Sequence, residues 1–194
     1  MEKGMKKFLI TSFLLLLLIA ATLLLRSALV NIDNEIYPLK YSKFVEEQSE
    51  IYEVDKALVY AVIRTESSFD PEAVSEIGAR GLMQITKSTF EWAQMKMGKE
   101  FSDDSYDDLF DPETNIKYGT FLLSAFIKEF GSVDNALCAY HAGWGNAKSW
   151  LKDPEYSPDG ENITNIPFKD TNWYVNKINE VMDKYKSLYF SEKE

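Results

Sequence analysis

The carboxyl group of Glu66 occupies a position that suits acid–base chemistry. It lies three residues after Ile63, so a predicted helix over residues 56–67 places both side chains on one apolar face. Removal from water disfavours the charged form of a carboxyl group and raises its pKa. A carboxylic acid that keeps its proton near neutral pH can protonate a glycosidic oxygen. The alternative is a structural role, in which Glu66 pairs with Arg64 or Arg80 or faces water.

A loop with two glycines follows, in the sequence Ser-Glu-Ile-Gly-Ala-Arg-Gly-Leu-Met-Gln from Ser75 to Gln84. The spacing of Gly78 and Gly81 indicates backbone that turns through positive φ or approaches another group closely. At the end of the loop, Gln84 is expected to direct its side-chain amide into a cleft. Two glycines in a loop are also typical of an ordinary turn.

Metal and cofactor chemistry is not indicated by this sequence. Its one histidine, His141, and its one cysteine, Cys138, do not form a ligand cluster of recognisable spacing. The acidic run at residues 103–108 lacks the glycine and the glutamate that a calcium loop of the EF-hand type requires. We expect Cys138, which has apolar neighbours, to be a small buried side chain rather than a nucleophile. The sequence therefore predicts no metal and no cofactor.

Capping residues and apolar spacing predict a succession of helices around these candidates. Helix starts are marked by Asp55, Thr86, Asp111 with Pro112, Ser132, and Asp170 or Thr171. The corresponding helices cover residues 56–67, 87–97, 112–130, 133–142 and 170–185, after a first amphipathic helix marked by Val45, Ile51 and Tyr52. Gly143-Trp144-Gly145 is expected to be a turn, and residues 152–169 an irregular segment. Because no run alternates as a strand does, the predicted fold class is all-α.

An uncharged apolar run from Phe8 to Leu25 differs from the rest of the chain. A helix of this length reaches across a bilayer core of about 30 Å. Three lysines precede it against one glutamate, so the N-terminus is expected in the cytoplasm and the remainder outside. The alternative is a cleaved signal peptide, whose apolar region is usually about 7–15 residues long. The sequence thus predicts a cytoplasmic tail at residues 1–7, a transmembrane signal-anchor at 8–25, a linker at 26–37 and one folded domain at 38–190.

The charge of the chain limits its partners. The sequence contains 21 Lys and Arg against 31 Asp and Glu, and four of the basic residues lie at or before position 26. A domain this acidic is repelled by phosphate backbones, so nucleic acid is not an expected partner. Its 11 Tyr, 12 Phe and 4 Trp favour a ligand that is held by short-range contacts.

Five segments, taken in order, resemble the signature motifs of the soluble lytic transglycosylase catalytic domain, which is similar in fold to goose-type lysozyme. These segments are residues 66–67, 75–84, 110–116, 139–143 and 171–175. The resemblance spans roughly residues 40–186, which is nearly all of the predicted domain. It implies a lysozyme-like fold and cleavage of peptidoglycan glycan strands on the outer side of the cytoplasmic membrane.

The resemblance also implies a role for each matching residue. Glu66 matches a single catalytic acid and base, which protonates the oxygen between N-acetylmuramic acid and N-acetylglucosamine. The same group then takes a proton from the muramic C6 hydroxyl, which closes a 1,6-anhydro ring without water. Ser75 matches a serine that hydrogen-bonds near the reacting sugar, and Gln84 matches a substrate-binding amide. Tyr140 matches a tyrosine close to the catalytic glutamate, and Tyr174 matches an active-site tyrosine of the last helix.

Three positions depart from the family pattern. His141 stands where the family usually has asparagine, and it is expected to replace the amide hydrogen bond or to act as a second titrating group. Trp144 stands where proline is usual, and it either extends a sugar-stacking surface or covers the core. Thr86 stands where methionine is common, which reshapes that part of the cleft.

Two other functions fit the same sequence. A lysozyme-type muramidase would hydrolyse the same bond with water, and it needs a further carboxylate, for which Asp70, Glu72 and Glu76 are candidates. A peptidoglycan-binding module without catalysis is the third function. The presence of Glu66, Ser75, Gln84 and Tyr140 together favours an enzyme.

Overall fold

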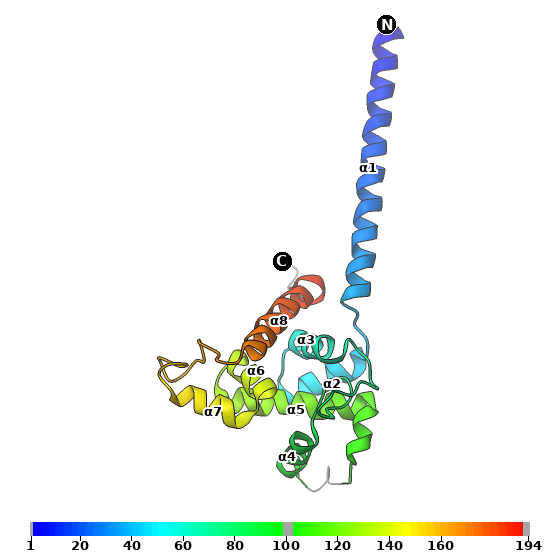
Figure 1. Ribbon diagram of the computed structural model, residues 1–194. Coiled ribbons are helices and arrows are strands. Elements are labelled where there is room, and N and C mark those ends of the chain that lie inside the picture. The colour runs from blue at the N-terminus through cyan, green and yellow to red at the C-terminus, as the bar shows by residue number, and fades with distance from the viewer. Residues whose placement is uncertain (1, 99–102, 192–194) are drawn as a thin grey trace. The chain divides into compact units, whose positions relative to one another are not determined.

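Helices form almost all of the regular structure in the computed structural model, which describes residues 2–98 and 103–191 (Figure 1). Within these ranges the only extended pairing consists of two isolated bridges, from Val74 to Arg80 and from Arg80 to Ile85. The prediction of an all-α fold is confirmed. The chain divides into two units, Met1–Leu39 and Lys40–Glu194.

The first unit is a single long helix, α1 (Glu2–Ile36). Its segment Lys7–Ser27 is long and apolar enough to cross a membrane, by length and composition. The helix continues through most of residues 26–37, so the predicted linker is largely helical. That segment contains no glycine or proline before Pro38, and a proline disfavours helical backbone in the residue before it.

The second unit contains the helices that surround the candidate residues. They are α2 (Ser42–Tyr52), α3 (Lys56–Ser67), α4 (Lys87–Met97), α5 (Pro112–Phe130), α6 (Val133–Ala142), α7 (Trp144–Lys152) and α8 (Lys169–Tyr185), with short helices η2 (Tyr106–Phe110) and η3 (Lys186–Phe190). Four predicted caps are confirmed, because the side chains of Asp55, Thr86, Asp111 and Ser132 each accept a hydrogen bond from a backbone N–H of the following helix. Helix α8 begins slightly earlier than predicted, at Lys169, and has no side-chain cap.

Helix α7 was not predicted from the sequence. Gly143 adopts φ of 92°, which ends α6, and Trp144 begins the next helix at once. The expectation of a simple Gly143-Trp144-Gly145 turn was therefore wrong, because a single glycine is sufficient to reorient the chain here. Residues 153–168, after α7, are irregular as expected.

The core of the second unit forms around α3 and α5. Every residue of α3 from Ala57 to Ile63 is buried, as expected of a helix that is apolar on all sides. Helix α3 packs against α8 and α2, while α5 packs against α2 and α6 (Figure 1). Cys138 of α6 is also fully buried, and burial raises the pKa of its thiol to about 12, which confirms the prediction of an inert side chain.

Candidate active site

Glu66 lies in the last turn of α3, where this buried helix reaches the surface. The Tyr174 hydroxyl of α8 donates a hydrogen bond of 2.7 Å to Glu66 Oε1. Burial raises the pKa of Glu66 from 4.5 to about 7, although the hydrogen bond from Tyr174 acts in the opposite direction. The raised pKa expected from the apolar face is confirmed. At neutral pH this carboxyl group is therefore divided between its acidic and basic forms.

The structural alternative for Glu66 is not supported. The guanidinium of Arg80 instead forms an ion pair with Asp107 and lies 4.2 Å from the centroid of the Tyr106 ring. No ion pair to Glu66 occurs in the part of the chain that the structure describes. Its carboxyl group thus lacks the cation that would return its pKa to the ordinary range.

Two tyrosines lie close to this carboxyl group. Tyr140 of α6 donates a hydrogen bond of 2.8 Å to the carbonyl oxygen of Met83, and Tyr174 donates to Glu66. Burial raises the pKa of both phenols well above 10, and the nearby Glu66 carboxylate adds to the effect. Both hydroxyls therefore stay protonated and remain hydrogen-bond donors.

The loop of residues 75–84, which contains Gly78 and Gly81, lines the same cleft as Glu66. The Ser75 hydroxyl accepts a hydrogen bond of 3.0 Å from the backbone N–H of Ala79. Gly78 and Gly81 have φ of 79° and 71°, as their spacing predicts. A Cβ atom at Gly81 would stand 2.2 Å from both the Asn115 side chain and the Leu109 carbonyl oxygen, so close approach also requires glycine there.

Asn115 of α5 holds the loop in place, a role that sequence analysis did not assign to it. This fully buried side chain donates hydrogen bonds to the carbonyl oxygens of Arg80 (3.0 Å) and Leu109 (2.7 Å). Its amide oxygen accepts a hydrogen bond of 2.8 Å from the N–H of Met83. The sequence feature that could have indicated this role is the position of Asn115 within the segment 110–116, four residues after the Asp111 cap.

Gln84 ends the loop in left-handed backbone, with φ of 48°. Its amide nitrogen donates hydrogen bonds to the carbonyl oxygens of Ala73 (3.0 Å) and Gly81 (2.9 Å). This side chain was expected to reach into a cleft. It does line one, while its two hydrogen bonds as a donor connect parts of the loop to each other.

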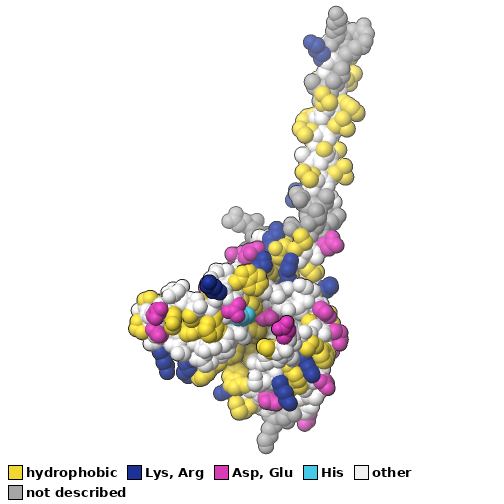
Figure 2. Space-filling view, viewed as in Figure 1, with side chains coloured by type: hydrophobic (Ala, Val, Ile, Leu, Met, Phe, Trp, Pro, Cys, Tyr) yellow, Lys and Arg dark blue, Asp and Glu magenta, His cyan; other side chains and the backbone are white. Residues whose placement is uncertain are grey.

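An open cleft of about 490 Å³ runs past these groups. It is lined by five of the predicted site residues, Glu66, Ser75, Gln84, Tyr140 and His141, and also by Glu76, Ile77, Ala79, Thr86 and Asp170. Tyr174, the sixth predicted residue, is buried and bonds to Glu66 without lining the cleft. Figure 2 shows the chain's one histidine beside acidic side chains, with hydrophobic side chains close to it on the same face.

His141 shows how a histidine fits this cleft. Its Nδ1 atom lies 3.0 Å from the Thr171 hydroxyl, and its ring centroid lies 4.5 Å from that of Tyr174. Partial burial lowers the pKa of His141, although Asp170 opposes this effect. The ring is therefore neutral near pH 7, which supports its interpretation as a hydrogen-bonding replacement for an amide. Asp170 was predicted only as a helix cap, and its approach to the cleft could not be anticipated.

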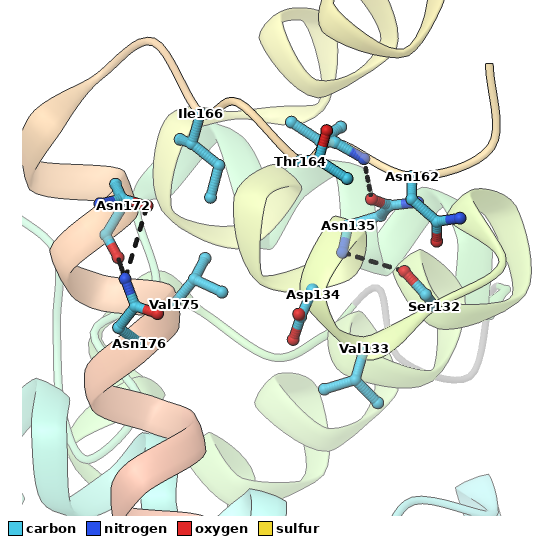
Figure 3. Close-up of a pocket in the computed structure, with 11 residues that line it drawn as sticks. Ser132, Val133, Asp134, Asn135, Asn162, Thr164, Ile166, Asn172, Val175 and Asn176 are labelled. Atoms are coloured by element: carbon cyan, nitrogen blue, oxygen red, sulfur yellow. Dashed lines mark hydrogen bonds between the residues drawn. The ribbon is translucent and has the colours of Figure 1, made fainter. Parts of the chain in front are cut away.

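A second cavity, of about 390 Å³, lies near the start of α6 and beside α8 (Figure 3). Its wall includes four asparagines, Asn135, Asn162, Asn172 and Asn176. The buried Asn135 donates to the carbonyl oxygens of Phe130 (2.9 Å) and Glu161 (2.7 Å) and accepts from the N–H of Ile163 (2.9 Å). We refer to this space as the amide cavity.

A helical domain that holds one sheltered carboxylic acid beside an open cleft is the arrangement expected of a lysozyme-like protein. Residues 43–163 match the transglycosylase SLT domain family, and the chain belongs to that family. Both the family and the fold expected from the sequence motifs are confirmed.

The relatives that this chain matches are longer than the matched region. The soluble lytic murein transglycosylase of Escherichia coli (strain K12) is 32% identical over 164 residues, which cover 82% of this chain and 25% of that protein. The membrane-bound lytic murein transglycosylase C of Pectobacterium atrosepticum is 30% identical over 167 residues, covering 76% of this chain and 47% of the relative. The chain therefore spans between a quarter and about half of these relatives.

A solved structure of a lytic transglycosylase is also similar to this chain. The inactive glutamate-to-glutamine mutant of lytic transglycosylase Slt from Pseudomonas aeruginosa superimposes with a TM-score of 0.70 at 28% identity. The match covers 81% of this chain and 25% of that one.

Proposed function

We propose that this chain is a peptidoglycan lytic transglycosylase in which Glu66 is the single catalytic acid and base. The observation that carries the proposal is the raised pKa of Glu66, about 7, caused by burial at the edge of an open cleft. A group with this pKa is present in both protonation states near neutral pH, so it can give a proton and later receive one. Membership of the SLT domain family and the names of the similar murein transglycosylases support the substrate.

The proposed reaction proceeds in two proton transfers. Protonated Glu66 gives its proton to the oxygen between N-acetylmuramic acid and N-acetylglucosamine, and the bond from C1 to that oxygen breaks. The Glu66 carboxylate then takes the proton of the muramic C6 hydroxyl, whose oxygen bonds to C1 and closes the 1,6-anhydro ring. The carboxyl group ends protonated, as it began. The substrate's N-acetyl group stabilises the positive charge that develops at C1.

The other site residues have supporting roles in this proposal. The Tyr174 hydroxyl stabilises the carboxylate form of Glu66 between the two transfers. Ser75, Gln84 and His141 line the cleft and offer hydroxyl, amide and imidazole groups to the sugar. Tyr140 forms part of the cleft wall, where its hydroxyl donates a hydrogen bond to the carbonyl oxygen of Met83. A related structure is of an inactive glutamate-to-glutamine mutant, which agrees with dependence on one glutamate.

Hydrolysis to a reducing end is the second candidate function. The observation that favours it is the presence of Glu76 and Asp170 on the wall of the same cleft, since a second carboxylate can orient water. Of the other carboxylates considered from the sequence, Asp70 accepts a hydrogen bond from the N–H of Glu72, and neither residue lines the cleft.

The products distinguish these functions. Purified full-length chain in detergent is incubated with peptidoglycan, and the released muropeptides are weighed by mass spectrometry. Anhydromuramic ends, lighter by one water than reducing ends, are the expected result. Reducing ends would establish the muramidase. If neither the native chain nor a Glu66→Gln control released products, the chain would be a binding module.

We also propose that α1 anchors the enzyme in the cytoplasmic membrane, with residues 1–7 inside, residues 8–25 across the bilayer and the domain at 38–190 outside. The apolar segment Lys7–Ser27 and the name of the membrane-bound relative support this arrangement. The expected result is that the chain stays in the membrane fraction at alkaline pH and is digested by protease added to intact spheroplasts. Release at alkaline pH or protection from the protease would contradict it.

A further inference from the structure

A groove, distinct from the amide cavity, lies next to the cleft that Glu66 lines, which we call the Glu66 cleft. It has a volume of about 290 Å³ and is lined by Ser88, Thr89, Trp92, Phe126, Ala139, Tyr140, Gly143 and Trp144. We call it the Trp144 groove. Tyr140 lines both the groove and the cleft, so the two spaces share a wall.

A row of hydroxyl groups also joins the two spaces. Thr86 lines the cleft, and its hydroxyl lies 2.8 Å from that of Thr89 and 3.3 Å from that of Ser88, which line the groove. A chain-like ligand that occupies the cleft therefore meets a continuous polar edge as it enters the groove.

The Trp144 ring is fixed in position while much of its surface stays open. It is the first residue of α7, directly after the Gly143 turn, and 40% of its surface is exposed. Its ring meets Phe130 edge to face at 6.5 Å, and the ammonium of Lys148, one turn later, lies 4.1 Å from its centroid. These contacts hold the indole as a rigid platform at low entropic cost for binding.

The lining of the groove suits an uncharged sugar. Trp92 and Phe126 pack at 5.6 Å and add further aromatic surface, while Ser88 and Thr89 supply hydroxyls. None of the described residues that line the groove is charged. Aromatic walls with a few polar groups suit the C–H face of a pyranose and its hydroxyls.

On the basis of the function proposed above, we propose that the Trp144 groove holds a neutral sugar ring of the same glycan strand, beside the ring that is cleaved at Glu66. Trp144 then determines a preference for strands long enough to reach the groove. The alternative, that Trp144 only covers the core, leaves its exposed surface without a role.

Binding of a defined probe tests this proposal. Full-length Glu66→Gln protein in detergent is titrated with the hexamer and the dimer of N-acetylglucosamine, and affinity is measured by calorimetry. Adding Trp144→Ala should weaken hexamer binding about tenfold and leave dimer binding nearly unchanged, since only the hexamer extends into the groove. Trp144→Phe should restore most of the affinity.

Trp173→Ala is the matched control, because Trp173 is 61% exposed and lines neither the cleft nor the groove. It should change hexamer affinity less than about twofold. Equal losses for Trp144→Ala and Trp173→Ala, or equal losses for hexamer and dimer, would overturn the proposal. Thermal unfolding identifies a variant that fails to fold, in which case Trp144→Phe and Trp144→Leu replace it in the comparison.

The test is independent of the reaction products. Binding is measured in a Glu66→Gln background, so a dependence on Trp144 would stand even if the native chain produced reducing ends. Conversely, anhydromuramic products with no effect of Trp144 would retain the proposed function and reject the groove.

Discussion

The Glu66 cleft and the amide cavity lie near opposite ends of α6, and both contact α8. In the amide cavity the polar groups satisfy one another: Asn135 makes three hydrogen bonds to backbone, and the Asn176 amide donates to the Asn172 carbonyl oxygen at 2.9 Å. In the cleft, the sheltered Glu66 carboxyl has one hydrogen bond from Tyr174 and a pKa of about 7.

The difference shows what makes a polar cavity reactive. Both spaces are of similar size, about 390 and about 490 Å³, and both have amides, hydroxyls and carboxylates in their walls. The cleft holds an ionisable group, Glu66, whose charge is disfavoured by burial and which forms no ion pair with any described residue. A group in that state exchanges protons near neutral pH, whereas paired asparagines stabilise the fold.

The same chemical change at each site gives the largest expected contrast. Glu66→Gln should lower the rate of peptidoglycan cleavage by about a thousandfold or more, because it removes the only proton donor of the proposed reaction. Asp134→Asn, at the exposed carboxylate of the amide cavity, should leave the rate within about twofold. Release of soluble muropeptides measures both. Comparable losses would remove the distinction between the two spaces.

Stability should show the reverse dependence. Asn135→Ala should lower the free energy of unfolding by about 2–4 kcal/mol, because it removes the partner of the Phe130 and Ile163 backbone groups, which are buried, and of the Glu161 carbonyl oxygen. Denaturant unfolding measures the loss, and the rate per folded molecule should not change. A variant with normal stability but little activity would place the amide cavity in the reaction.

Glu66 should also make stability depend on pH. Its pKa is about 7 in the folded chain against 4.5 for an exposed glutamate, so the folded state binds the proton more tightly. The contribution is fully present below pH 4.5 and is lost as pH rises through about 7. Glu66→Gln should therefore match the native chain at pH 4.5 and exceed its stability above pH 7 by up to about 3 kcal/mol. Thermal unfolding of the native chain and of Glu66→Gln across this pH range measures the difference, and a difference that does not grow with pH would contradict the raised pKa.

The smallest expected effect concerns Tyr174. Its hydrogen bond lowers the pKa of Glu66, so Tyr174→Phe should raise that pKa further. The alkaline limb of the kcat/KM profile should move to higher pH, and the maximal rate should fall about fivefold because the carboxylate loses a donor. An alkaline limb that moves to lower pH would contradict the proposed contact.

Local rules predicted most helices correctly. Asp55, Thr86, Asp111 and Ser132 cap the helices that they were expected to start, because capping depends on neighbours within one turn. The same rules missed α7, since Gly143 and Gly145 together resemble a turn. They also treated as a linker the segment after Arg26, which has no residue that ends a helix before Pro38.

The candidate site was predicted in part. Five residues predicted for the site do line one cleft, and their selection rested on ordered motifs. The loop support by Asn115 and the approach of Asp170 were not predicted, because both depend on packing between distant segments. Periodicity and capping describe a residue's own helix but not the helix that it will meet.

Most of the helices, and the position of Glu66 on an apolar face, could be predicted from the sequence, because both follow from residues a few positions apart. The contact of Glu66 with Tyr174, 108 residues later, and the wall that Tyr140 forms between the cleft and the Trp144 groove depend on how the helices pack in three dimensions. The physical reason is that the pKa of a carboxyl group depends on everything packed around it, and most of those neighbours come from elsewhere in the chain.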